Sequence, residues 1–140
     1  MGTLSDFFIA DSKSFASYST GADFPDSDRC QAKRITPLEA ANLLAVLRGH
    51  GDPLELINEF PMLTPEDDEH WTFAVPVDFI VLLAALSTAS VAPHAAAFAK
   101  ATEEELGWSE SEAQPFLAEL VALAQRAKAN GKAMFLWLSL

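Results

Sequence analysis

The chain has 140 residues, half of them hydrophobic, and its 20 acidic and 9 basic residues give a net charge of −11. This apolar fraction excludes a disordered chain, and the length predicts one globular domain over residues 1–140. The negative charge argues against binding to nucleic acid or to an anionic membrane, because both need clustered Lys and Arg side chains.

The cellular compartment is indicated by what the first residues and the cysteine count lack. Cys30 is the only cysteine, so no intramolecular disulfide can form. Residues 1–6 lack the basic segment and the apolar run of a secretory signal, and we therefore expect a cytoplasmic protein. The 24 alanines and the single tyrosine are typical of a bacterial sequence of high genomic GC content.

In the first half of the chain, the pattern predicts an apolar strand over 4–10, a helix over 11–18 and an aspartate-rich loop over 20–29. The clearest helix follows Thr36. The residues at 36–39, Thr-Pro-Leu-Glu, combine a capping hydroxyl, a first-position proline and a carboxylate that closes a capping box. We expect this helix to end at Gly49. A shorter helix over 53–60 stops at Pro61, and one or two helical turns follow over 64–70.

In the second half, alternating polarity predicts a strand over 71–75, and Pro76 opens a helix that is apolar on all sides over 79–86. Residues 79–99 carry no formal charge, but we interpret them as two buried helices that break near 91–93 rather than as a membrane span. The second of these helices covers 93–102.

The final predicted helix covers 112–130, with a capping box formed by Ser109 and Glu112 or by Ser111 and Gln114. A strand over 132–140 follows. It is apolar on both faces, which favours cover on both sides by the same fold or by a second subunit. Together these elements predict an α+β fold, predominantly helical, with about six helices packed on a small sheet that includes the N- and C-terminal strands.

The main electrostatic anomaly is a stretch without positive charge. No Lys or Arg occurs between Arg48 and Lys100, where there are eight carboxylates. Such a patch can steer a basic protein toward its binding site, although it can also be a solvated surface that only keeps the protein in solution. Seven of the eight lie in residues 52–69: Asp52, Glu55, Glu59, Glu66, Asp67, Asp68 and Glu69.

A metal site within this stretch is the second interpretation. Glu66 and His70 would share one face of a helical turn, and Asp67 or Asp68 could add oxygen ligands suited to Mn²⁺ or Mg²⁺. The spacing matches neither an EF-hand nor the His-Glu-x-x-His zinc motif. Consecutive carboxylates point away from one another on a helical turn, which argues against a shared ion.

The remaining reactive residue is Cys30, and the sequence gives no catalytic residue or cofactor site. The basic residues at 29, 33 and 34 could lower the pKa of the Cys30 thiol and make it reactive, but an ordinary partly buried cysteine fits the sequence as well. No nucleophile elbow is present. Trp71, Trp108 and Trp137 lie in or beside apolar segments, and we expect them to pack in the core or at an interface rather than to stack on a ligand.

The sequence therefore favours a small acidic protein-interaction module without enzymatic activity, which binds a basic partner through residues 52–69. A toxin-neutralising immunity protein is one form of this hypothesis, by analogy alone. The alternative is a small metal-binding protein or enzyme that uses Glu66, Asp67 and His70. Homodimerisation through the C-terminal strand around Trp137 is compatible with either.

Overall fold

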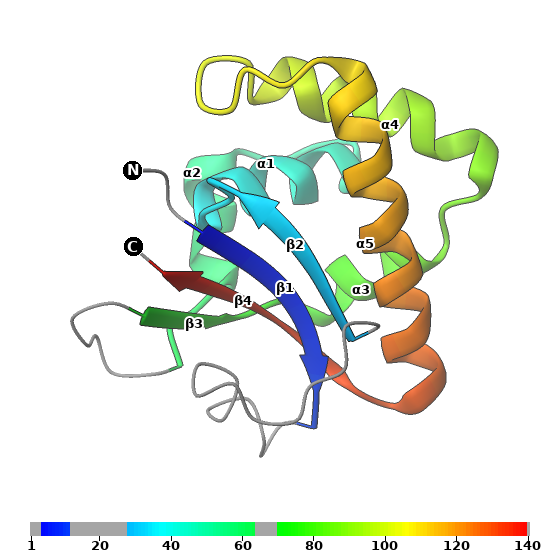
Figure 1. The fold of residues 1–140 in the computed structure, drawn as a ribbon. Coiled ribbons are helices and arrows are strands. Elements are labelled where there is room, and N and C mark those ends of the chain that lie inside the picture. Colours follow the sequence, from blue (N-terminus) through cyan, green and yellow to red (C-terminus); the bar gives the residue numbers. More distant parts are fainter. Residues whose placement is uncertain (1–3, 12–27, 64–69, 140) are drawn as a thin grey trace.

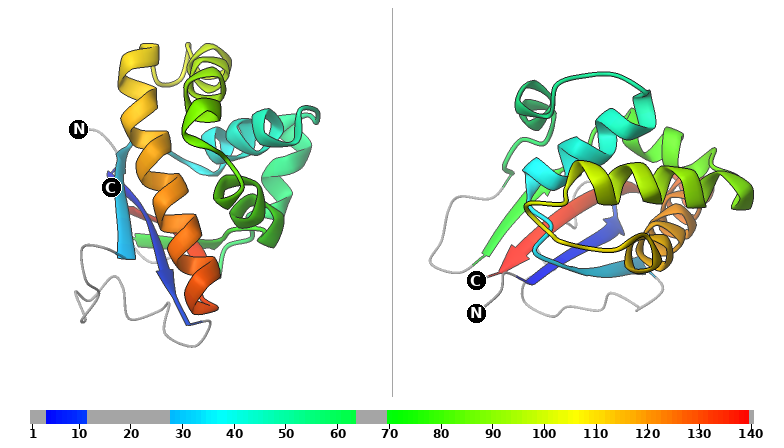
Figure 2. Two further views of the ribbon diagram at one scale, coloured as in Figure 1. Left: turned by 90° about the vertical axis from the view of Figure 1, so that its right-hand side faces the viewer. Right: turned by 90° about the horizontal axis from the view of Figure 1, so that it is seen from above.

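The computed structural model describes residues 4–11, 28–63 and 70–139, except the side chains of Leu4, Lys33 and His70. These residues form a four-stranded antiparallel sheet with the order β2-β1-β4-β3, and the helices cover one of its faces (Figures 1 and 2). The strands are β1 (Leu4–Ala10), β2 (Arg29–Lys33), β3 (His70–Ala74) and β4 (Ala133–Ser139). The helices are α1 (Pro37–Arg48), α2 (Pro53–Leu56), the 3₁₀ helix η3 (Ile57–Glu59), α3 (Val77–Ala84), α4 (Thr88–Ala101) and α5 (Glu110–Asn130).

The predicted α+β class is confirmed, and so is the pairing of the two terminal strands. β1 and β4 are antiparallel neighbours from Leu4 opposite Ser139 to Ala10 opposite Ala133. The described residues contain five α-helices where about six were expected. The helix predicted over 11–18 and the turns predicted over 64–70 fall largely outside the described residues.

Burial of β4 on both faces is also confirmed. On the helical side, Met134 and Leu136 belong to the main core. On the opposite side, the ring of Phe135 stacks on that of Phe8 at 5.3 Å between centroids, and both side chains are buried. Because β4 lies between β1 and β3, a second subunit could not extend the sheet at this strand. Homodimerisation around Trp137 therefore stays a prediction. The surface available for it is the half-buried part of β4 around Trp137, on the face of the sheet opposite the helices.

Strand β2 is a correction, because the sequence analysis ended a loop at residue 29 and predicted no strand after it. Five residues pair with β1, from Phe8 opposite Arg29 to Leu4 opposite Lys33. The inward side chains are those of Cys30 and Ala32, which are too small to produce a marked hydrophobic alternation. The pairing is therefore determined by β1 rather than by the local sequence.

The helix boundaries follow the capping residues where these are strong. Thr36 accepts a hydrogen bond from the amide of Leu38, and Glu39 closes the capping box by accepting from the Thr36 amide at 2.8 Å. The C-cap of α1 is Gly49, whose φ of 78° is in the left-handed region that glycine adopts without strain. Of the two alternative boxes for the last helix, the structure has the one between Ser109 and Glu112.

The predicted break near 91–93 is wrong. α3 ends at Ala84, and α4 begins at Thr88 after Ser87, whose hydroxyl accepts from the Ser90 amide at 3.2 Å. Pro93 lies within α4 and removes only its own donor, while burial of residues farther along the helix stabilises the turns after it. Within the described part of the chain, no helix has both the length and the hydropathy needed to cross a membrane.

The core lies between the sheet and the helices α1, α3 and α5. Phe7 of β1 packs at 6.2 Å between ring centroids against both Phe79 of α3 and Phe116 of α5. These contacts place the first half of α5 beside strands β1 and β2.

Candidate functional site

The segment between Arg48 and Lys100, which we call the acidic stretch, starts with a short helix that has exposed carboxylates. Asp52 caps α2 by accepting a hydrogen bond from the Leu54 amide at 3.0 Å, and Pro53 occupies the first helical position. The Glu55 side chain, one turn farther, is exposed to solvent. Neither carboxylate forms an ion pair with a described residue, and both side chains are exposed to solvent.

Arg48, the last residue of α1, accounts for two other carboxylates of the stretch. Its guanidinium donates to both oxygens of Glu59, at 2.8 and 2.9 Å, and it contacts Asp78 at 2.7 Å. These hydrogen bonds hold the pKa of Glu59 below its usual value. Two carboxylates thus share one cation, and this part of the surface remains negative.

The other predicted site residues belong to the segment that precedes β3 and to its first residue. Glu66, Asp67, Asp68 and Glu69 lie outside the described residues, and of His70 only the backbone, at the start of β3, is described. Among the residues that the structure does describe, no three His, Cys, Asp or Glu side chains form a group that could hold a metal ion. The metal-binding hypothesis for Glu66, Asp67 and His70 therefore stays a prediction.

The acidic stretch also contains exposed apolar side chains, which the sequence analysis did not identify. Large hydrophobic residues that the structure shows as exposed all lie between residues 54 and 81. Leu54 and Val77 are the most accessible, at 72 and 75 %. We call these residues, with the exposed acids Asp52 and Glu55, the acidic–apolar region: Asp52, Leu54, Glu55, Met62, Leu63, Val77 and Val81.

Several contacts fix the elements that present the acidic–apolar region. The segment before residue 64 runs along the outer edge of β3, with the Leu63 amide donating to the Thr72 carbonyl at 2.8 Å. The Ala74 amide donates to the Pro61 carbonyl at 2.9 Å. Arg48 joins α1 to η3 and α3 through its bonds to Glu59 and Asp78. The exposed side chains therefore lie on elements that hydrogen bonds and ion pairs hold against the rest of the fold.

Cys30 does not have the reactive environment that its basic sequence neighbours suggested. Its side chain is buried, and the thiol donates a hydrogen bond to Glu119 of α5, with 3.7 Å between sulfur and oxygen. Burial, the carboxylate of Glu119 and that of Asp6 raise the pKa of Cys30 to about 12. The thiol is therefore protonated at neutral pH, and it is neither a nucleophile nor a metal ligand in this state.

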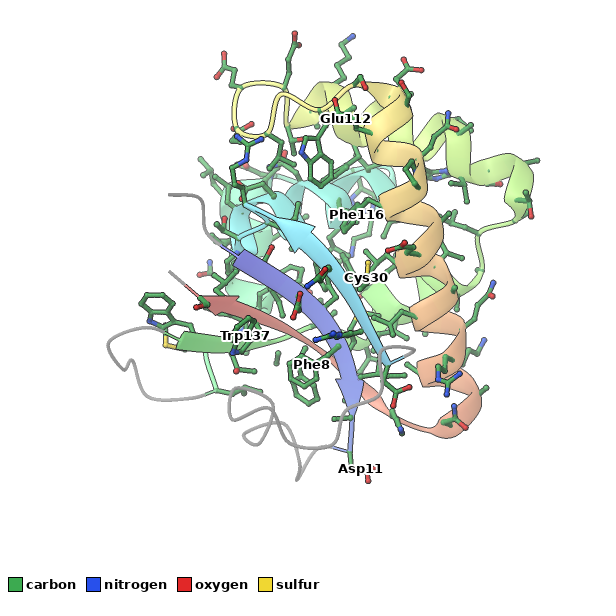
Figure 3. All side chains as sticks on the ribbon, viewed as in Figure 1. Phe8, Asp11, Cys30, Glu112, Phe116 and Trp137 are labelled. Carbon is green, nitrogen blue, oxygen red and sulfur yellow. The ribbon has the colours of Figure 1, made fainter. Side chains whose placement is uncertain are left out.

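A second feature lies between α5 and the edge of the sheet, as a cavity of about 480 Å³. Its helical wall contains Glu112, Phe116 and Glu119 of α5 together with Trp108 from the turn before it. Glu112 and Phe116 lie along the first half of the helix, and Cys30 lies between β2 and α5 (Figure 3). The indole of Trp108 makes edge contacts with the rings of Phe98 and Phe116, at 6.3 and 5.3 Å between centroids, and these fix its position.

The opposite wall of the cavity comes from β1, β2 and β4. Ser5 pairs with Ala32 on the helical face of the sheet, whereas Asp6 pairs with Gln31 and Trp137 on the opposite face, so the lining includes residues from both faces. The spacing of Glu112, Phe116 and Glu119 was visible in the sequence. Their approach to the edge of β2 depends on tertiary structure, so sequence reasoning missed the cavity.

No family model, curated protein or solved structure matches this chain. The function proposed below therefore rests on the chain's own residues.

Proposed function

We propose that this chain is a non-catalytic protein-interaction module that binds a basic partner through residues 52–69 and the adjoining surface of α3. The main support is that the large apolar side chains shown as exposed lie on α2, on the segment before residue 64 and on α3, in the same part of the chain as the exposed carboxylates of Asp52 and Glu55. A contiguous patch of exposed apolar side chains on a folded domain is typical of an interaction site, and we infer that the acidic–apolar region forms one. Their burial supplies affinity, whereas charged groups around them orient the partner and accelerate association.

The charge of the region favours a basic partner over a neutral or acidic one. Arg48 is the cation nearest in sequence, and its guanidinium is already bonded to Glu59 and Asp78. Asp52 and Glu55 have no such partner among the described residues. The electrostatic field of a negatively charged surface raises the association rate constant of a cationic protein by about 10- to 10³-fold at low ionic strength.

An immunity protein that neutralises a toxin would be one example of this class of function, since it acts by covering a surface and needs no catalytic residue. The acidic–apolar region supports a partner whose surface is cationic and has an apolar centre.

Site-specific photo-cross-linking tests this proposal. A photoreactive amino acid replaces Leu54 in one variant and Glu104, an exposed residue of the turn after α4, in the control. Both positions are next to an exposed carboxylate, but only the first belongs to the acidic–apolar region. We expect one basic protein to be cross-linked at position 54 and absent at position 104 in an extract of the source cell.

Purified components must then reproduce the complex, since capture from an extract can be indirect. The cross-linked protein, once identified, should bind the unmodified chain and should bind less well when the salt concentration is raised. Cross-linking of the same proteins at both positions, or of acidic proteins alone at position 54, would contradict the proposal.

A further inference from the structure

The geometry points to a second binding site: the cavity beside α5, which we infer to bind an aliphatic amine, that is, an ammonium group on an apolar stem. Its volume of about 480 Å³ is within the range of small-molecule sites. None of its lining residues belongs to the acidic–apolar region. The inference is therefore independent of the proposed protein-binding function.

The face of α5 toward the cavity has a carboxylate at each end and apolar side chains between them. Glu112, Phe116 and Glu119 are spaced by four and three residues, so they lie along one side of the helix. The two glutamates are separated by about 10 Å along the axis, at 1.5 Å per residue. An aliphatic stem can cover Phe116 while its cationic ends approach the two carboxylates.

Trp108 adds an aromatic surface that favours cations. The negative face of an indole attracts ammonium groups, and tryptophan is the most effective residue in this role. The turn that holds Trp108 is fastened to the sheet side, because the Arg34 guanidinium donates to the Leu106 carbonyl at 2.7 Å. Contacts within the protein therefore fix the aromatic wall, which reduces the entropy lost on binding.

The charges around the cavity exclude other ligand classes. Its lining has three carboxylates, those of Asp6, Glu112 and Glu119, and includes no Lys, Arg or His among the described residues, so an anion would be repelled. The three carboxylates do not form a group that could hold a metal ion in the described part of the chain. An extended organic cation can approach carboxylates at separate points of a cavity, whereas a metal ion needs them to converge.

Calorimetric titration with hexamethylenediamine tests the inference, and the diol of the same chain length is the uncharged control. We expect saturable binding of the diamine and none of the diol. Replacement of both glutamates, Glu112→Gln with Glu119→Gln, should weaken binding about tenfold, because each loses a charge pair. Glutamine can still accept from the Ser109 amide and from the Cys30 thiol, and we therefore expect the double variant to fold. Glu119→Gln alone, with a smaller loss, is the fallback if it does not.

Glu110→Gln is the matched control, because Glu110 is exposed on the same helix but does not line the cavity. It should leave diamine binding unchanged, as should Glu55→Lys in the acidic–apolar region. The inference is overturned if the diamine does not saturate, if the diol binds equally, or if Glu110→Gln weakens binding as much as the double variant. It is also overturned if a lysine peptide binds the cavity and the free diamine does not, since the cation would then be a partner's side chain.

Discussion

Two ion-pair clusters of opposite composition show how this acidic chain uses its few cations. In one, the carboxylate of Asp28 forms ion pairs with Arg126, at 2.7 Å, and with Lys132, at 3.2 Å. In the other, the guanidinium of Arg48 is bonded to Glu59 at 2.8 Å and to Asp78 at 2.7 Å. The first has two cations for one acid, and the second has one cation for two acids.

The difference in burial indicates the role of each cluster. Asp28 is 4 % exposed and joins the start of β2 to the end of α5 and to the residue before β4. Both acids of the Arg48 cluster are partly exposed, at the border of the acidic–apolar region. We infer that the Asp28 cluster mainly stabilises the fold, whereas the Arg48 cluster joins three helices and leaves a net negative charge for a partner.

The largest expected effect is that of Asp28→Asn. The substitution keeps the shape of the side chain but removes the charge that faces two cations. Charge-assisted hydrogen bonds contribute about 1.5–3 kcal/mol, and because Arg126 is half exposed we expect a loss near the lower end, about 2 kcal/mol. Urea unfolding monitored by circular dichroism measures this as a lower midpoint with an unchanged slope. An unchanged midpoint would show that the buried cluster adds no stability.

The contact between the Cys30 thiol and Glu119 contrasts with both ion-pair clusters, because here a carboxylate faces a neutral group. It can be tested through the pH dependence of stability. The pKa of Cys30 is raised from 9.0 to about 12 in the folded protein, so its contribution is fully present below pH 9 and is lost as the pH rises toward 12. The loss is about 1.4 kcal/mol per pH unit above 9. Between pH 8 and pH 10, the free energy of unfolding should therefore decrease by about 1.4 kcal/mol more in the unmodified chain than in Cys30→Ala. Equal pH dependence in the two proteins would argue against a buried, carboxylate-facing thiol.

The smallest expected effect on stability is that of Arg48→Met. Exposed ion pairs contribute about 0.2–1 kcal/mol each, and we expect a total loss below about 1 kcal/mol at pH 7. Because the pKa of Glu59 is lowered by Arg48, this contribution is present at neutral pH and is lost as the pH falls through that lowered pKa. Urea unfolding of both proteins at pH 7 and in acid should show the difference disappearing. A loss as large as that of Asp28→Asn would remove the distinction between the clusters.

Elements with local signals could be predicted from the sequence. The capping box at Thr36 and Glu39 uses residues three positions apart, so it determines the start of α1 without any tertiary contact. The apolar pattern of 4–10 likewise predicted β1 with its observed bounds. In both cases the determining contacts or periodicity lie within one element.

Elements that depend on distant contacts could not be predicted in the same way. The hydrogen bonds of Asp28 reach residues about a hundred positions away, and no sequence pattern links them. Alternation of Cys30 and Ala32 with polar residues was a weak strand signal that pairing with β1 made decisive. Pro93 suggested a helix break, but the hydroxyl of Ser87 and the burial of the later turns outweighed it.

The candidate site was predicted in part. The absence of Lys and Arg between Arg48 and Lys100, and the seven carboxylates over 52–69, were visible in the sequence. The exposure of Leu54 and Val77 was not, because apolar residues at helical positions normally indicate a buried face. The cavity beside α5 required the packing of a helix against a strand that the sequence analysis did not identify.

The most direct test of the central claim is the affinity of the cross-linked basic protein for two matched charge reversals. Glu55→Lys and Glu104→Lys change the net charge equally, and both side chains are exposed. If the acidic–apolar region is the binding site, Glu55→Lys weakens binding about tenfold or more, or about 1.4 kcal/mol, while Glu104→Lys has less than about a twofold effect. Equal weakening by the two substitutions would show that only the net charge of the protein matters, and would contradict the proposed site.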